Sequence, residues 1–139
     1  MHTEMFRQQH KEILEVLGGL GKACLSPGNI DSASGASLRA QLVALSGKVT
    51  VHLGSEDRSL YPTLLALTGQ PPAKVAEAFS KEMGSLAGAF KQFVGHWPTG
   101  DSIAADPATF AQECLGVAKA LTNRIDREEK ELYPLLDAV

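Results

Sequence analysis

The chain of 139 residues is short of the features that mark several common classes of protein. No apolar run approaches the roughly 20 residues that a membrane-spanning helix needs, so we expect no membrane partner. Residues 1–7 do not show the charged-then-apolar order of a secretory signal, which favours a cytoplasmic location. The net charge is -3 without a long run of one sign, and the basic patch that nucleic acid would require is missing.

Cysteine is also scarce. Cys24 and Cys114 lie far apart without a Cys-x-x-Cys partner, so the sequence supports neither a disulfide framework nor a zinc finger. Both fall at apolar positions of helical patterns, and we interpret them as small buried hydrophobic residues. The chain has no Gly-x-Ser-x-Gly turn and no phosphate-binding glycine loop. We therefore expect a protein that is not an enzyme.

Signals for β-strands and hairpins are nearly missing, whereas apolar residues recur at helical spacing in four segments. Clusters of proline and glycine separate these segments. Short connections make consecutive helices antiparallel neighbours. The sequence thus predicts an all-α, up-down-up-down four-helix bundle forming one domain over residues 1–139. The expected helices cover about residues 3–25, 34–64 with Ser34 or Ser37 as N-cap, 73–96, and 106–135 with Asp106 as N-cap.

An internal repeat links two of these helices. Residues 52–62 read HLGSEDRSLYP, and residues 124–134 read RIDREEKELYP. Glutamate aligns with glutamate and Leu-Tyr-Pro follows at the same distance in both copies. The first copy begins with His-x-x-x-Glu and the second with Arg-x-x-x-Glu. Residues four apart share one helix face, so each copy directs its two polar side chains to one place.

Five residues interrupt the apolar stripes of three helices: His10, His52, Glu56, Arg124 and Glu128. Burying such groups is costly unless they are paired or bound to a metal. Bundle interiors hold metal sites built from histidine and carboxylate, and these ligands suit iron, manganese or zinc. The alternative is a metal-free polar cluster in which Arg124 forms salt bridges with Glu56 and Glu128. Spacing alone leaves both interpretations open.

Three motifs give the chain a specific resemblance. Residues 6–14 (FRQQHKEIL) resemble the opening histidine motif of hemerythrin-like domains of the HHE cation-binding kind. Residues 52–62 are similar to the second motif of that family, and residues 128–134 resemble its closing motif. The match spans essentially the whole chain, in order. The resemblance implies two irons in the bundle, with His10 and His52 serving one of them and with Glu56 and Glu128 as bridging carboxylates.

Two histidines that the resemblance implies are replaced. Met83 stands where the third helix should present one, and Arg124 stands where the fourth should. Both belong to the same iron, which indicates a degenerate di-iron site. Met83 and Arg124 thus mark vacated second-metal positions. The expected metal ligands are then His10, His52, Glu56 and Glu128.

Three interpretations remain for the degenerate site. The first keeps one metal and places the Arg124 guanidinium where the second cation would lie. The second has no metal, and Arg124 with a protonated histidine holds the carboxylates. The third makes Met83 a thioether ligand, which suits hard iron poorly. We favour one non-haem iron, with zinc or no metal as alternatives.

One iron would leave positions open to dioxygen or nitric oxide. Reversible dioxygen carriage in the family uses both irons, so the resemblance favours sensing, small-ligand binding or iron handling. The alternative is a metal-free interaction or scaffolding module whose protein partner the sequence does not identify. Among the other polar residues, we expect Tyr61 and Tyr133 to pack near helix ends, Glu82 to face solvent and Glu129 to be a weaker supporting residue. His2 and His96 have no partners at ligand spacing.

Overall fold

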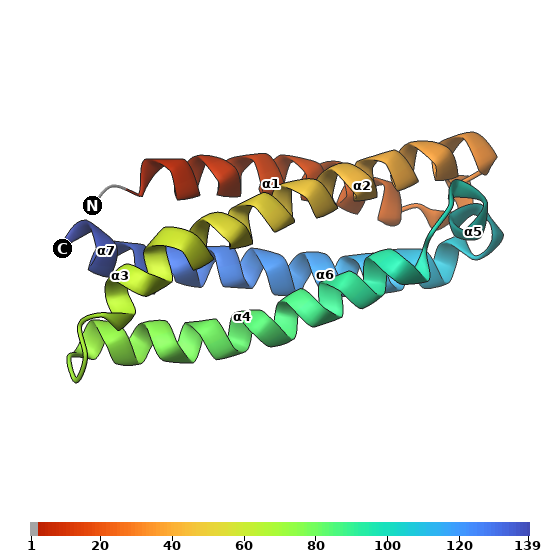
Figure 1. Cartoon of the computed structure of the whole chain (residues 1–139). Helices are drawn as coiled ribbons and strands as arrows, with labels where there is room; N and C mark the ends of the chain where they lie inside the picture. Colours follow the sequence, from red (N-terminus) through yellow and green to blue (C-terminus); the bar gives the residue numbers. More distant parts are fainter. Residues whose placement is uncertain (1–2) are drawn as a thin grey trace.

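The computed structural model describes residues 3–139, so His2 lies outside the described residues. Four long helices run lengthwise beside one another, each antiparallel to the next in the chain (Figure 1). These residues contain no β-strand. The prediction of an all-α, up-down-up-down bundle is confirmed. The long helices are α1 (Glu4–Cys24), α2 (Ser32–Ser55), α4 (Pro71–His96) and α6 (Pro107–Arg127).

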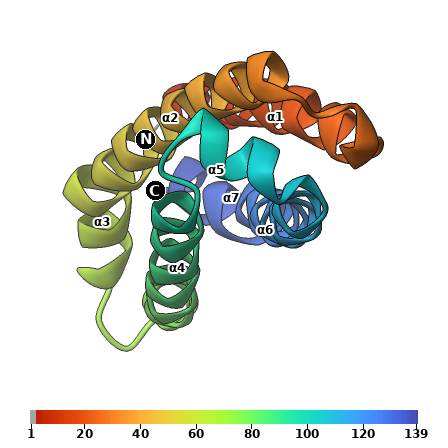
Figure 2. The same ribbon diagram turned by 90° about the vertical axis from the view of Figure 1, so that its right-hand side faces the viewer.

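Short elements close the two ends of the bundle. One end holds α3 and α7, which continue α2 and α6 after five-residue π-helical turns, η2 and η3 (Figure 1). The opposite end holds the 3-10 turn η1 and the helix α5, which crosses the end of the bundle (Figure 2). The short elements are η1 (Pro27–Asn29), η2 (Glu56–Leu60), α3 (Tyr61–Leu65), α5 (Gly100–Ala105), η3 (Glu128–Leu132) and α7 (Tyr133–Asp137).

Helix α5 was not expected from the sequence, which suggested only a connection there. A capping box at Thr99 starts it, because the Thr99 side chain accepts a hydrogen bond from the Ser102 amide at 3.0 Å. It packs closely on α2, where a Cβ atom on Gly35 would collide with the carbonyl oxygen of Gly100. The absence of side chains at Gly35 and Gly100 therefore permits this contact.

The helix starts follow ordinary capping chemistry, with one correction. Asp106 caps α6 as predicted, accepting a hydrogen bond from the Thr109 amide at 3.3 Å. The prediction of Ser34 or Ser37 as N-cap of α2 was wrong. Asp31 takes this position, because its side chain accepts a hydrogen bond from the Ser34 amide at 2.9 Å. Helix α2 consequently begins two residues earlier, at Ser32.

The apolar core is divided into two clusters by a layer of buried polar side chains. The larger cluster lies toward η1 and α5 and includes Ile13, Val49 and Leu121. The smaller lies at the α3 and α7 end and includes Phe6 and Leu60. On each long helix that contributes a side chain to the polar layer, this side chain lies between the two apolar clusters. Its members are His10, His52, Glu56, Arg124 and Glu128.

None of the helices in residues 3–139 combines the length and apolar character that a membrane span requires. The cytoplasmic location stays a prediction.

Candidate metal centre

The polar layer gathers histidine and glutamate side chains from three parts of the chain. His10 comes from α1, His52 from the last turn of α2, and Glu56 and Glu128 begin the two π turns. Each is at most 3% exposed. The Nε2 atom of His10 lies 3.0 Å from Nε2 of His52 and 3.1 Å from Oε1 of Glu128. The structure thus brings all four predicted ligands together near one point.

Three of the four satisfy a strict geometric condition for sharing one ion. One ligand atom each from His10, His52 and Glu128 lie within 4.8 Å of one another. Glu56 lies at the edge of this group, with Oε1 at 3.3 Å from Nε2 of His52. The donor set is therefore two imidazole nitrogens and one or two carboxylates. This combination suits iron, manganese and zinc.

A hydrogen bond to a neighbouring amide orients the His52 imidazole, whereas Nδ1 of His10 makes none within residues 3–139. The Nδ1 atom of His52 lies 2.8 Å from the side-chain oxygen of Gln9, which can only accept a hydrogen bond. The His52 Nδ1 atom therefore carries the proton, and Nε2 presents a lone pair to the centre. Glu129 supports His10 less closely, with Oε2 at 3.4 Å from Nδ1. Such partners fix ligand orientation in metal sites, and Gln9 was not anticipated from the sequence.

The π turns place a tyrosine in the centre. The amide of Tyr133 donates to the carbonyl of Glu128, five residues back, because the turn is wider than an α-turn. Pro134 follows and has no amide hydrogen, so it cannot continue the normal ladder. The Tyr133 hydroxyl donates to Oε2 of Glu56 at 3.1 Å and lies 2.9 Å from Nε2 of His10.

The expectation that Tyr133 packs near the helix end covers only part of its role. It is fully buried and touches two predicted ligands. In a regular α-helix, residues five apart such as Glu128 and Tyr133 lie on different faces. A period of 3.6 residues therefore does not predict that Tyr133 contacts the ligands. The repeated Leu-Tyr-Pro sequence was the available signal.

The two glutamates have opposite electrostatic environments. Burial, followed by the nearby charge of Glu128, raises the pKa of Glu56 to about 10. Burial alone would also raise the pKa of Glu128, but the hydrogen bond to His10 and the nearby His52 outweigh burial and leave the pKa well below its usual value. In the metal-free chain at neutral pH, Glu56 is therefore protonated and Glu128 ionised. Protonation of Glu56 leaves Glu128 as the negatively charged carboxylate of the pair.

The centre fits a bound cation. The lone pair on His52 Nε2 faces His10 Nε2 at 3.0 Å, an approach that needs a proton or a cation between the nitrogens. Oxygen Oε1 of Glu56 and oxygen Oε2 of Glu128 are buried without a hydrogen bond. Unpartnered buried carboxylate oxygens are rare, and coordination to a metal would satisfy them.

The predicted salt bridges from Arg124 to Glu56 and Glu128 are not formed. Arg124 is 5% exposed, but its guanidinium points toward α4. It donates to Oε2 of Glu82 at 2.8 Å and to the carbonyl oxygen of Phe79 at 2.6 Å, and it stacks 4.0 Å from the Phe79 ring centre. Glu82 keeps about half of its side chain in solvent, so pairing with it requires less loss of water than pairing with the buried carboxylates. Arg124 lowers the pKa of Glu56 only by its charge.

Glu82 therefore has a structural role that its expected solvent-facing position did not suggest. Its side chain is 49% exposed, yet Oε2 accepts from both Arg124 and Arg127, at 2.8 and 2.6 Å. These two cations lower the pKa of the Glu82 carboxyl, with the Arg127 hydrogen bond as the larger cause.

A small cavity of about 20 Å³ adjoins the centre on the side of Met83 and Arg124. His52 and Glu128 form part of its wall, and the remaining wall is aliphatic. Both residues that replace the expected histidines therefore face one space beside the predicted ligands. Leu53 and Met83 also line an outer pocket of about 260 Å³ between α2 and α4. They are the side chains that separate the inner cavity from that outer pocket.

Comparison with known families agrees with this geometry. A family model described as the hemerythrin HHE cation binding domain matches residues 1–136. The chain belongs to this family of cation-binding domains. No curated protein and no solved structure matches the chain.

Proposed function

We propose that the chain holds one non-haem iron through His10, His52, Glu56 and Glu128, in a sensing or small-ligand-binding role. The observation on which this depends is the buried convergence of these four side chains beside a cavity lined by Met83 and Arg124. Ferrous iron with this ligand set would supply open coordination positions for dioxygen or nitric oxide. The protein residues supply orientation, exclusion of water and a low-dielectric surrounding.

The two residues at the vacated positions, Met83 and Arg124, favour one metal ion rather than two. Met83 offers a thioether, which is a weak ligand for hard iron. Arg124 lines the cavity, and its guanidinium is held on α4 by Phe79 and Glu82. A second cation there would meet this fixed positive charge. Dioxygen carriage that relies on two irons is therefore disfavoured.

The cavity supports a ligand of two or three atoms. A space of about 20 Å³ accommodates about one water-sized molecule, which excludes organic substrates of ordinary size. Its wall is apolar apart from the groups of the centre, a property that favours an uncharged diatomic ligand. Rotation of the Leu53 or Met83 side chain would connect it with the outer pocket between α2 and α4.

A metal-free scaffolding module is the second candidate. Two observations favour it: Arg124 pairs with Glu82 and Phe79, and the pKa of Glu56 is raised. Together they allow the polar layer to stay buried without a bound cation. The two proposals differ in metal content.

Anaerobic titration with ferrous iron, followed by desalting and elemental analysis, separates the two candidates. One iron per chain is expected for the native sequence, with strong loss in His52→Ala. His96→Ala is the matched control, because His96 is exposed and pairs with Glu113 outside the centre. Nitric oxide added to the loaded protein should give an electron paramagnetic resonance signal of a ferrous nitrosyl. No retained iron would favour the scaffold, and two irons per chain would contradict the single-site proposal.

The vacated positions allow a gain-of-function test. Met83→His together with Arg124→His should raise the iron content from one to two per chain and add oxo-bridge absorption bands in air. Arg127 remains as a partner for Glu82 in this variant. A folded double variant that retains one iron and stays colourless would show that the assignment of the second position is wrong.

A further inference from the structure

The contact between His10 and Glu128 fixes the register of α1 against α6. The two helices are antiparallel, so a step forward along α1 matches an equal step backward along α6. Cys24 lies 14 residues after His10, and Cys114 lies 14 residues before Glu128. Fourteen residues are nearly four helical turns, so both cysteines return to the shared face. The register therefore sets the two thiols opposite each other, roughly 21 Å along the bundle from the metal centre.

The side chains confirm this pairing. Cys24 and Cys114 are each 3% exposed, belong to the larger core cluster and are free thiols. Each thiol also shifts the pKa of the other, which requires the two sulfur atoms to lie close together. They are also the only two cysteines in the chain. From the sequence we interpreted them as separate buried hydrophobic residues, because they lie far apart in the chain and their register in the bundle was not known.

The two thiols are not equivalent. The hydrogen bond from Cys114 lowers the pKa of Cys24, whereas the same interaction together with burial raises the pKa of Cys114. A thiolate is the nucleophile in thiol oxidation, and Cys24 ends α1 whereas Cys114 lies within α6. We therefore assign Cys24 as the attacking residue and Cys114 as the resolving one.

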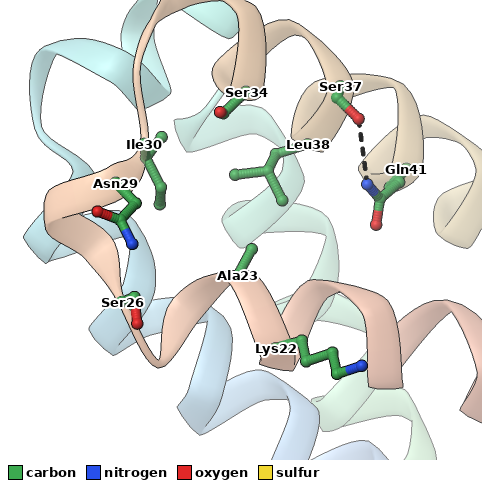
Figure 3. A pocket seen from close by; sticks show the side chains of 9 residues that line it. All are labelled: Lys22, Ala23, Ser26, Asn29, Ile30, Ser34, Ser37, Leu38 and Gln41. Atoms are coloured by element: carbon green, nitrogen blue, oxygen red, sulfur yellow. Dashed lines mark hydrogen bonds between the residues drawn. The ribbon is translucent and has the colours of Figure 1, made fainter.

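Cys24 lies at a point where the helix meets solvent. It is the last residue of α1, and the next residue, Leu25, is 75% exposed. A surface hollow of about 450 Å³ lies between the end of α1 and the start of α2, with Ala23, Ile30 and Leu38 in its wall (Figure 3). Fraying of one helical turn would bring a small oxidant from this hollow to the Cys24 sulfur.

We propose that Cys24 and Cys114 form a reversible dithiol–disulfide pair that ties α1 to α6 when a hydroperoxide oxidises it. The Cys24 thiol loses its proton and the thiolate attacks the peroxide, so that a sulfur–oxygen bond forms and the oxygen–oxygen bond breaks. The leaving alkoxide or hydroxide takes up a proton, which balances the one that Cys24 lost, and departs as alcohol or water. The Cys114 sulfur then attacks the sulfenic sulfur, which forms the disulfide and releases water. Two thiols and one hydroperoxide thus give one disulfide, one alcohol or water, and one water. A dithiol reductant reverses the change.

This proposal does not depend on the metal centre, and the test uses the metal-free full chain. Reduced protein is exposed to graded hydrogen peroxide, blocked with a maleimide after denaturation and analysed by mass spectrometry. The expected product is a monomer with both thiols protected and a peptide linking Cys24 to Cys114, reversed by dithiothreitol. The apparent melting temperature should rise in the oxidised form, because the bond restricts the unfolded chain.

The single variants test the assigned roles. In Cys114→Ser, the remaining Cys24 should form a sulfenic acid that dimedone traps. In Cys24→Ser, the remaining Cys114 should react at least about tenfold more slowly, because it lies buried within α6, whereas Cys24 ends α1 beside an exposed residue. Native thiols that stay free at peroxide concentrations that oxidise the denatured chain would overturn the proposal. Intermolecular disulfides as the main product, or equal reactivity of the two single variants, would overturn it as well.

Discussion

Arg124 occupies an apolar helix stripe without bonding to the carboxylates beside it. Its guanidinium instead spans the interface from α6 to α4 and reaches the Phe79 carbonyl and Glu82. The ring of Phe79 covers the guanidinium face, at 4.0 Å from the ring centre. The residue is thus a bridge between helices as well as a positive charge beside the centre.

Replacing Arg124 should therefore cost more than replacing its neighbour. Arg124→Ala removes two hydrogen bonds and buried packing, and should lower the free energy of unfolding by about 2–4 kcal/mol. Arg127→Ala is the matched control, because Arg127 shares Glu82 but has a side chain that is 42% exposed. Its loss should cost less than about 1 kcal/mol. Urea denaturation of metal-free proteins measures both, and equal losses would contradict the bridging role of Arg124.

Glu56 makes the stability of the metal-free chain depend on pH. Its raised pKa means that the folded chain keeps a proton that the unfolded chain loses above its ordinary pKa near 4.5. The free energy of unfolding should therefore fall as pH rises from about 5 to 9, by at most about 1.4 kcal/mol per pH unit from this group. The lowered pKa of Glu128 acts only below this window.

Glu56→Gln should flatten this pH dependence, since glutamine does not titrate. Glu12→Gln, on an exposed part of α1, should leave the slope unchanged. Guanidinium denaturation midpoints at pH 5, 7 and 9 provide the comparison. If Glu56→Gln retained the full slope, the protonation of Glu56 in the folded chain would be refuted.

At the level of the elements, the two π turns determine which side chains enter the centre. Both precede Tyr-Pro, and in each the tyrosine amide bonds five residues back, to Glu56 or Glu128. The repeat does not produce equivalent tyrosines, however. The Tyr133 hydroxyl has partners in the centre, whereas the Tyr61 hydroxyl is buried without a hydrogen bond.

Matched removal of the two hydroxyls tests this difference. Tyr133→Phe should lower the free energy of unfolding by about 1–3 kcal/mol, because Glu56 and His10 lose a buried partner. Tyr61→Phe should change it by less than about 0.5 kcal/mol, since no hydrogen bond is lost. Thermal denaturation of the two variants gives the comparison. Similar losses in both would show that ring packing, rather than the Tyr133 hydroxyl, supports the centre.

Helical spacing was sufficient to predict the bundle, the long helices and the meeting of His10 with His52 and Glu128. It was not sufficient for Tyr133, because a π turn changes the period locally. Nor did it predict the direction of the Arg124 side chain, which depends on partners from another helix. Assignment of metal ligands to these positions remains a prediction.

At the scale of the molecule, the polar layer divides the bundle into two apolar clusters of unequal size. The larger one joins α1, α2, α4 and α6 with α5, whereas the smaller one is formed by the π turns, α3, α7, the start of α1 and the first half of α4. The smaller cluster is held on one side by the layer that carries the unpartnered carboxylate oxygens. Metal binding should consequently stabilise the two ends unequally.

Hydrogen exchange in the presence and absence of metal should reveal this asymmetry. Removing ferrous iron with a chelator is expected to speed amide exchange in residues 56–65 and 128–137 by tenfold or more, which corresponds to about 1.4 kcal/mol of local stability. Residues 13–24 and 110–121, which lie in the larger cluster, should change much less. His52→Ala serves as the control, because its exchange should not respond to iron. A uniform response along the chain would mean that the bundle opens only as a whole, and the polar layer would then not divide it into separately stabilised ends.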